Sequence, residues 1–302
     1  MNDLAILEIK NLTKSFGDKA VLTGLSLSVP EHSVFGFIGR NGAGKTTTMK
    51  AALGLVSPDG GEIYVAGEKV CRGQTGTNRH IGYLPDVPEF YPFMTAREYL
   101  TLCGESLGMS KAEIKQRSEE LLSLVGLAGE KHRVRGYSRG MKQRLGIAQA
   151  LLSRPKLLIC DEPTSALDPI GRKEILDILL AAREQTTVLF STHILSDAER
   201  ICTDAAFLEG GKIALQGSIS ELKSIHRTQE FTLELAGGEH MPALLSKFPR
   251  AKAVGTEALS FCGGADEIHA LLAFIAEKKI AFTKIERAEP TLEALFMEVA
   301  AK

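Results

Sequence analysis

The feature that most limits what this chain can fold into is one loop, Gly39–Thr46. It reads GRNGAGKT and fits G-x-x-x-x-G-K-[ST] at every fixed position. The uncharged run Ser33–Gly39 leads into it and predicts a buried strand, and a helix is expected to start near Lys45. The backbone N–H groups of such a glycine-rich loop converge on a phosphate, and the helix N-terminus adds partial positive charge. The loop therefore predicts an α/β protein that binds a nucleoside triphosphate.

The residue types within the loop suggest individual roles. Lys45 is expected to reach the β- and γ-phosphates of the nucleotide, and the Thr46 hydroxyl is expected to ligate Mg²⁺. The residues expected to contact the nucleotide are Gly39, Asn41, Gly42, Ala43, Gly44, Lys45, Thr46 and Thr47. A glycine-rich turn without a ligand is the alternative, and the strand before the loop and the helix after it argue against it. We therefore predict that the chain binds a nucleoside triphosphate together with Mg²⁺.

A second run, Lys156–Pro163 (KLLICDEP), is an apolar strand that ends in two acids. Ligands of open α/β sheets bind at the carboxyl ends of strands, so Asp161 and Glu162 are expected to face the same crevice as the loop. Asp161 suits Mg²⁺, through a water, and Glu162 could polarise an attacking water as a general base. An ordinary strand end that leaves the core through acids is the alternative. The phosphate loop favours the catalytic interpretation.

The rest of the chain divides into two predicted domains. Buried strands alternate with helices over residues 1–225, which predicts a parallel sheet, and residues 86–155 are mostly helical in pattern. The first thirty residues look like strands joined by a hairpin turn at Gly17–Lys19. The sequence pattern of residues 226–302 predicts, in this order, a strand, a helix, two short strands, a helix, a strand and a helix. This order predicts a small C-terminal α+β domain.

Three further motifs narrow the class of protein. Tyr137–Arg144 (YSRGMKQR) precedes the acids, Ser165–Asp168 (SALD) follows them, and Ser191–His193 (STH) ends the next strand. Together with the phosphate loop, this order closely resembles the nucleotide-binding subunit of ATP-binding-cassette (ABC) transporters, over roughly residues 4–220. Within the family the chain is most similar to the ATPases of ABC-2 type exporters. Their signature often has the sequence Y-S-x-G-M-x-Q-R, and their chain ends in a segment like Pro290–Phe296.

The resemblance implies a P-loop NTPase core with an antiparallel β subdomain and a helical subdomain. It also implies ATP hydrolysis that energises transport through a separate membrane permease. In the family, two ATPase domains pack head to tail, so Ser138 and Gly140 of one copy of a homodimer would cover the γ-phosphate held by the other. Asp168 belongs to the loop that crosses this interface. His193 would contact the γ-phosphate and the region of Glu162.

Two positions depart from the family pattern. Members commonly place a tyrosine under the adenine ring, and Phe16 stands in its place, where it can still stack; a core or hairpin aromatic is the alternative. The family's glutamine, expected after Gly82–Pro85, is replaced by Asp86. A carboxylate can still ligate Mg²⁺, and it adds negative charge beside Asp161 and Glu162.

The segment after Asp86, Glu89–Met94 (EFYPFM), concentrates aromatic residues. The resemblance places the groove for the membrane subunit's coupling helix near this point. Aromatic side chains rimmed by polar ones suit such a contact. Packing of the helical subdomain on itself is an equally good interpretation of the sequence.

Composition and charge argue against other classes of protein, namely those that bind nucleic acid, span a membrane or are secreted. The 36 Lys and Arg nearly cancel the 37 Asp and Glu, which leaves a formal net charge of −1, whereas proteins that bind nucleic acid usually carry a basic excess. No apolar run is long enough to span a bilayer, no secretory signal is expected, and five irregularly spaced cysteines predict reduced thiols. We expect a cytoplasmic protein without a nucleic acid partner, held at the inner face of the cell membrane by its permease.

Two other functions are weighed against this one. A non-transport ABC ATPase acting on nucleic acid or ribosomes usually carries a coiled-coil insertion, fused cassettes or a basic arm, and this sequence shows none. A regulator that binds ATP without cleaving it is disfavoured by Glu162, His193 and the signature. The transported substrate is not encoded here, because specificity lies on the membrane subunit. The C-terminal domain could stabilise a dimer, regulate activity or cap a hydrophobic face.

Overall fold

The computed structural model describes residues 5–71, 73, 76–225, 230–287 and 291–300. The chain forms two compact units, one of Met1–Leu222 with Phe296–Lys302 and one of Lys223–Leu295, which we call the larger and the smaller unit. Among the described residues, no helix combines the length and the apolar character that crossing a membrane requires.

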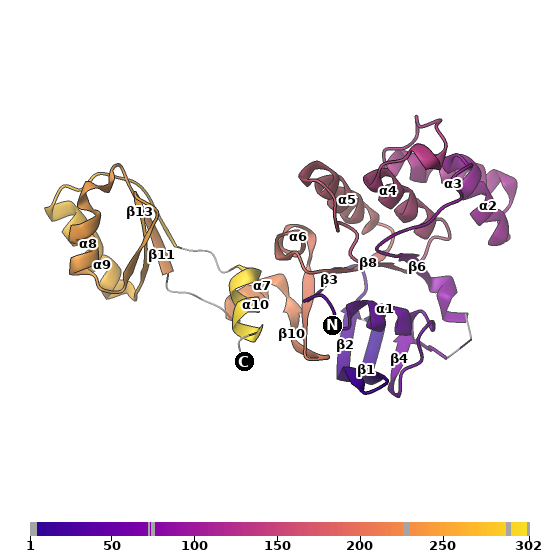
Figure 1. The fold of residues 1–302 in the computed structure, drawn as a ribbon, viewed down its shortest axis with the longest axis horizontal. Coiled ribbons are helices and arrows are strands. Elements are labelled where there is room, and N and C mark those ends of the chain that lie inside the picture. Colours follow the sequence, from indigo (N-terminus) through magenta and orange to yellow (C-terminus); the bar gives the residue numbers. More distant parts are fainter. Residues whose placement is uncertain (1–4, 72, 74–75, 226–229, 288–290, 301–302) are drawn as a thin grey trace. The chain divides into compact units, whose positions relative to one another are not determined.

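A six-stranded sheet lies at the centre of the larger unit (Figure 1). Its strand order is β10-β9-β3-β8-β7-β6. The strands are β3 (Val34–Gly39), β6 (Ile81–Leu84), β7 (Leu157–Cys160), β8 (Thr187–Thr192), β9 (Asp204–Glu209) and β10 (Lys212–Ser218). All neighbours pair in parallel except β10, which runs antiparallel to β9. The parallel sheet expected from the alternation of buried strands and helices is confirmed.

Both faces of this sheet are buried, because its strands alternate between two hydrophobic cores. In β7, Leu158 and Cys160 point into the core beneath a layer of helices, while Leu157 and Ile159 point into the core shared with a second sheet. The helices of the first layer are α2 (Ala96–Ser106), α3 (Lys111–Leu124), α4 (Arg139–Ala150), α5 (Pro169–Ala182) and α6 (Leu195–Ile201). Helix α1 (Lys45–Ala52) lies in the other core (Figure 1). The helical pattern predicted for residues 86–155 is thus confirmed.

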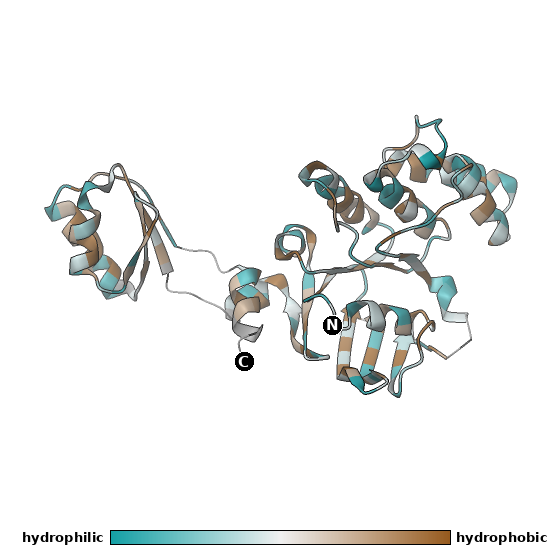
Figure 2. Cartoon of the chain, viewed as in Figure 1, coloured by the Kyte–Doolittle hydropathy of each residue, from teal (hydrophilic) through white to brown (hydrophobic). Residues whose placement is uncertain are grey.

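The second sheet of the larger unit has the order β2-β1-β4-β5. Its strands are β1 (Ala5–Phe16), β2 (Lys19–Pro30), β4 (Gly60–Val65) and β5 (Glu68–Lys69). Hydrophobic and hydrophilic residues alternate along β1, β2 and β4 (Figure 2), as expected for strands with one buried face. Phe16 pairs with Lys19 across a two-residue turn, in which Gly17 takes a φ of 57°. The predicted hairpin is therefore confirmed.

The smaller unit is an antiparallel sheet with helices in its connections. Its elements are β11 (Glu230–Leu235), α8 (Met241–Lys247), β12 (Ala251–Val254), β13 (Ala258–Cys262), α9 (Ala265–Glu277) and β14 (Phe282–Arg287). The sheet order β12-β13-β11-β14 is that of the split βαβ, or ferredoxin-like, arrangement. Leu233, Leu244 and Leu271 bring the sheet and both helices into one core. The element order predicted for this region is confirmed.

The end of the chain returns to the larger unit. Helix α10 (Leu292–Ala300) carries Phe296, whose ring stacks on Phe207 of β9 at 5.7 Å between centroids and 28° between planes. Residues 296–302 therefore belong to the larger unit, whereas the sequence pattern assigned all of 226–302 to a C-terminal domain. The remaining short elements are α7 (Ile219–Ile225), η1 (Gly76–His80), η2 (Val134–Gly136) and η3 (Gly238–His240).

Candidate active site

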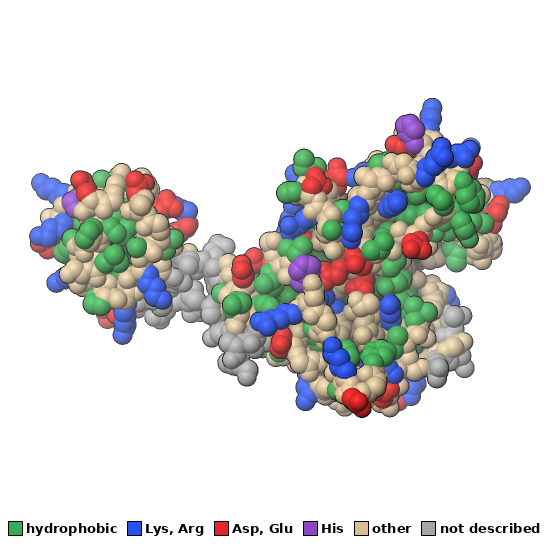
Figure 3. Space-filling view, viewed as in Figure 1, with side chains coloured by type: hydrophobic (Ala, Val, Ile, Leu, Met, Phe, Trp, Pro, Cys, Tyr) green, Lys and Arg blue, Asp and Glu red, His purple; other side chains and the backbone are tan. Residues whose placement is uncertain are grey.

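Four parallel strands, β3, β6, β7 and β8, bring the phosphate loop, Asp86, the pair Asp161 and Glu162, and His193 to one edge of the central sheet, because their carboxyl ends all lie there. A cavity of about 560 Å³ opens at this edge. Of the predicted residues, all of which the structure describes, ten line it: Phe16, Asn41, Gly42, Gly44, Lys45, Thr46, Thr47, Asp86, Glu162 and His193. Figure 3 shows acidic side chains gathered with a histidine on this unit.

Two glycines of the loop are required by close packing around them. A Cβ on Gly44, which has a φ of 113°, would lie 2.8 Å from Leu22 Cδ2. A Cβ on Gly39 would lie 2.8 Å from the carbonyl oxygen of Leu208. Gly39 and Ala43 do not line the cavity and instead shape the loop from behind, so their predicted contact with the nucleotide is through backbone alone.

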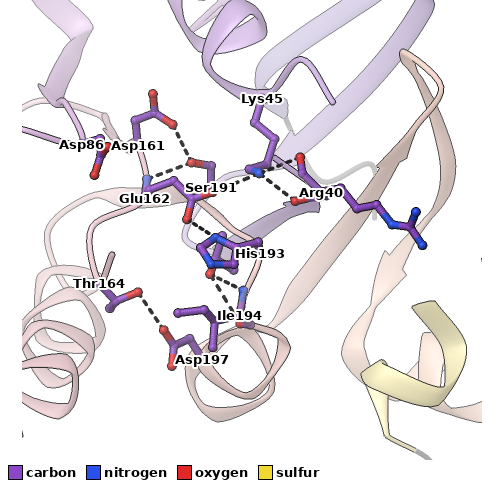
Figure 4. Close-up of polar contacts among 12 residues, drawn as sticks. Arg40, Lys45, Asp86, Asp161, Glu162, Thr164, Ser191, His193, Ile194 and Asp197 are labelled. Atoms are coloured by element: carbon purple, nitrogen blue, oxygen red, sulfur yellow. Dashed lines mark hydrogen bonds and ion pairs between the residues drawn. The ribbon is translucent and has the colours of Figure 1, made fainter. Parts of the chain in front are cut away.

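Lys45 is buried, with only 5% of its side chain exposed, and its positive charge is compensated by three oxygen atoms. Its Nζ donates to the carbonyl oxygens of Gly39 and Arg40, at 2.7 and 3.2 Å, and lies 3.0 Å from Glu162 Oε1 (Figure 4). The other carboxylate oxygen, Glu162 Oε2, lies 2.9 Å from His193 Nδ1. One carboxylate thus bridges the loop lysine and the histidine, which the sequence assigned to separate motifs.

Asp161 and Glu162 are adjacent in sequence but have different surroundings. Glu162 has a φ of 48°, an uncommon value for a residue with a side chain, and its carboxylate faces the cavity. Asp161 is 3% exposed, does not line the cavity, and accepts a hydrogen bond of 2.7 Å from Ser191 Oγ. The same Ser191 Oγ accepts from the Glu162 backbone N–H at 2.9 Å (Figure 4). Ser191 therefore orients both acids from the neighbouring strand β8.

The sequence analysis placed Ser191 and Ser165 in motifs and Lys19 in a hairpin turn, but it gave no role in the site to these residues or to Val21, and Lys19, Val21 and Ser165 line the cavity. A signal for Lys19 did exist, because a two-residue hairpin turn pairs it with Phe16. No comparable signal marks Ser191, because its contacts with the acids depend on β7 and β8 being neighbours in the sheet.

Buried polar contacts also support the chain just after Glu162. Thr164 Oγ1 donates to Asp197 Oδ2 at 2.7 Å, and Arg172 Nη2 donates to Asp197 Oδ1 at 2.6 Å (Figure 4 draws the first). Asp197, 3% exposed on α6, thereby ties this segment to α5. The anchored segment holds the backbone that positions Glu162.

The acids also act on the neighbouring phenol of Tyr83. Burial raises the pKa of Tyr83 to about 12, since the phenolate is poorly solvated, and the negative charges of Asp161 and Asp86 add to the rise. Among the described residues there is no group of three or more His, Cys, Asp or Glu side chains that could hold a metal ion.

Ser138, Gly140 and Asp168 lie outside the cavity and stand at helix starts. Ser138 Oγ accepts from the Met141 N–H and caps α4, and Asp168 Oδ1 accepts from the Gly171 N–H and caps α5, each at 3.2 Å. Both capping residues are exposed. A Cβ on Gly140 would meet its nearest neighbour among the described residues, Leu167 Cδ2, at an ordinary 3.9 Å. Packing within this chain therefore does not require glycine at position 140.

Comparison with known proteins decides the family. A family model described as ABC transporter matches residues 22–165. The chain is 40% identical over 299 residues to an uncharacterized ABC transporter ATP-binding protein of Bacillus subtilis (strain 168), YxlF, and the match covers 97% of this chain and 99% of that protein. This chain belongs to the ATP-binding proteins of ABC transporters. It therefore binds ATP, and ATP hydrolysis is the characteristic activity of its family.

Other relatives of this ABC ATPase agree. The chain is 40% identical to the bacitracin transport ATP-binding protein BcrA of Bacillus licheniformis, over 74% of this chain and 72% of that protein. A solved structure of an ATP-binding subunit of an ABC transporter is 32% identical, with a TM-score of 0.65, over 73% of this chain and 92% of that one. The resemblance inferred from the motifs is confirmed, as is the P-loop NTPase core.

The aromatic segment of this ABC ATPase divides between two roles. Phe90 packs edge-on against Tyr99 of α2, with ring centroids 5.0 Å apart. Tyr91 and Phe93 are instead about half exposed, at 51% and 58%. Tyr91 and Tyr99 line a cavity of about 490 Å³, together with Tyr83 at the end of β6. Internal packing therefore explains Phe90 but leaves Tyr91 and Phe93 facing outward.

Proposed function

We propose that this ABC ATPase drives export through a separate membrane subunit, with Glu162 as the general base for hydrolysis of ATP. The observation that carries the proposal is the bridge from Lys45 through Glu162 to His193 inside the cavity. The triphosphate draws Lys45 away from Glu162, because several phosphate oxygens offer the lysine more negative charge than one carboxylate. Glu162 then has a free oxygen with which to orient water against the γ-phosphate, and His193 holds its other oxygen.

The oxygen donors at the cavity fit Mg²⁺. Thr46 and Asp86 line the cavity, and Asp161 lies behind them with one oxygen engaged by Ser191. These are hard ligands in the small number that Mg²⁺ takes from a protein when phosphates supply others. We assign Thr46 and Asp86 as direct ligands and Asp161 as a ligand through water. Mg²⁺ held by these residues would supply charge neutralisation at the transferred phosphate.

We further propose that two copies of the chain close around ATP. Ser138, Gly140 and Asp168 stand outside the cavity of their own chain, so in this arrangement they serve the nucleotide of a second copy. The exposed start of α4 offers a hydroxyl, backbone N–H groups and the partial positive charge of a helix N-terminus. The absence of a side chain at Gly140, which packing among the described residues does not require, supports close approach of a phosphate held by another chain.

The larger unit is the ATP-binding domain in this proposal, and the smaller unit is an accessory domain. The cavity lined by Tyr83, Tyr91 and Tyr99 receives a helix of the membrane subunit, which holds the ATPase at the inner face of the cell membrane. Export as the direction is supported by relatives named for bacitracin transport, linearmycin resistance and lantibiotic transport. The net charge of −1 gives no support to a role on nucleic acid.

The decisive variant is Glu162→Gln. We expect it to keep ATP binding, to reduce phosphate release to background, and to accumulate as an ATP-bound dimer in light scattering, because the amide cannot accept the proton of water. Glu184→Gln, the same change at an exposed residue, serves as the matched control and keeps full turnover. Hydrolysis near the wild-type rate in Glu162→Gln would show that another group is the base.

A further inference from the structure

Asp86 belongs to the cavity and is also held by the helix that carries the signature residues. Its Oδ1 lies 3.2 Å from Nη2 of Arg139, the first residue of α4. Its backbone carbonyl accepts a hydrogen bond of 2.5 Å from Nε2 of Gln143. Arg139 and Gln143 are four residues apart and so face the same side of α4. Residue 86 is therefore attached to α4 twice, once through its backbone and once through its charge.

The two attachments differ in how readily they can be exchanged. Gln143 is fully buried, so its hydrogen bond to the backbone is shielded from water. The side chains of Arg139 and Asp86 are 42% and 48% exposed, and ion pairs of such exposure contribute little to stability. The backbone of residue 86 thus stays fixed to α4, while its carboxylate is free to change partners.

A second partner for this carboxylate is a divalent cation that enters with the triphosphate. The Asp86 side chain lines the cavity together with Thr46 and Glu162. A doubly charged ion attracts a carboxylate more strongly than a guanidinium does at the same distance. Once the carboxylate turns to the ion, Arg139 loses its counter-ion. Its positive charge then stands between Ser138 and Gly140, at the N-terminus of α4.

We propose that Arg139 is a positioning residue that competes with the nucleotide-bound divalent cation for Asp86, so that loading the cavity frees a positive charge at the start of α4. The freed guanidinium strengthens the anion site that the same chain presents to the nucleotide of its twin. The inference rests on the assignment of Asp86 to the metal under the proposed function. It adds that the aspartate at this position works together with the arginine of the signature.

The test measures metal binding without turnover. In a Glu162→Gln background with saturating ATP, Mn²⁺ is titrated as the probe and its bound fraction is read by electron paramagnetic resonance. Arg139→Gln is expected to lower the Mn²⁺ dissociation constant by about threefold, because an exposed ion pair that competes is lost. Arg139→Lys, which keeps the charge, should stay closer to the parent. Lys142→Gln removes a charge from the same helix and should leave the constant unchanged.

A double-mutant cycle separates competition for Asp86 from a general effect of charge. In an Asp86→Asn background, Arg139→Gln is expected to leave the Mn²⁺ constant unchanged. The proposal is overturned if Arg139→Gln leaves Mn²⁺ affinity unchanged or weakens it, or if it shifts affinity equally in the Asp86→Asn background. If the parent protein binds neither ATP nor Mn²⁺, the proposed function itself is wrong, which is a different result.

Discussion

The two anion-binding regions of this ABC ATPase are built to different degrees. The cavity at the sheet edge is complete within one chain, since buried Lys45 already has three oxygen partners and Ser191 orients both acids. The start of α4 is exposed, and its Ser138 only caps its own helix. The difference supports the proposal that one copy holds a nucleotide by itself, whereas catalysis uses a second copy to complete the site.

The largest effect is expected for Lys45→Ala. It should weaken ATP binding to the dilute chain by about 100-fold, because charge-assisted contacts to the phosphates are lost and the negative charge of Glu162 loses its lysine partner in the cavity. Titration with a fluorescent ATP analogue measures the effect. Lys50→Ala, at the exposed end of the same helix, controls for loss of charge. An unchanged affinity for ATP in Lys45→Ala would show that the cavity is not the nucleotide site.

Changes at the start of α4 should lower the rate of ATP turnover but leave the affinity for ATP nearly unchanged. Ser138→Asp preserves the helix cap, because aspartate caps as well as serine, but it places a negative charge where the twin's phosphate is proposed to lie. We expect ATP binding to the dilute chain within about twofold of wild type and ATPase activity at least about tenfold lower. Ser138→Asn has the same size and capping ability without the charge and should lose less. Equal losses in both variants would argue against an anion at this position.

Ser191→Ala tests whether the hydroxyl of Ser191, on strand β8, holds Asp161 and Glu162 in place. The variant leaves the Asp161 carboxylate and the buried Glu162 N–H without their shared partner. We expect a loss of about 1–3 kcal/mol in the free energy of unfolding and a several-fold lower kcat. Chemical denaturation and a phosphate-release assay measure the two effects. A normal kcat in a destabilised protein would limit Ser191 to a structural role.

The smallest effect is expected for the chemical reactivity of the buried Cys160 thiol. Burial raises the pKa of the Cys160 thiol, as does the neighbouring Asp161 charge, and burial likewise raises the pKa of Cys202. A raised thiol pKa means less thiolate at a given pH, so neither residue should react with iodoacetamide at pH values near 8. Cys71 is exposed and should react first. Mass spectrometry of the labelled protein identifies the modified cysteine, and early labelling of Cys160 would reveal a loosely packed sheet edge.

Much of the site could be predicted from sequence, because its parts are local motifs at strand ends. A strand, a glycine-rich loop and a helix place Lys45 next to the phosphate-binding backbone, and the parallel sheet brings Glu162 and His193 to the same edge. The contacts that could not be predicted join segments far apart in sequence. The pairing of Asp86 with Arg139 depends on the packing of α4, and the role of Ser191 depends on strand order. No local pattern encodes either.

The stacking of Phe296 on Phe207 has a consequence for how the protein is made. The ribosome completes β9 long before it reaches α10, and every residue of the smaller unit is synthesised in between. The ATP-binding unit therefore emerges with one aromatic contact still missing and gains it only after the smaller unit has been synthesised. A chain truncated before α10 would keep its phosphate loop but would leave Phe207 without that partner.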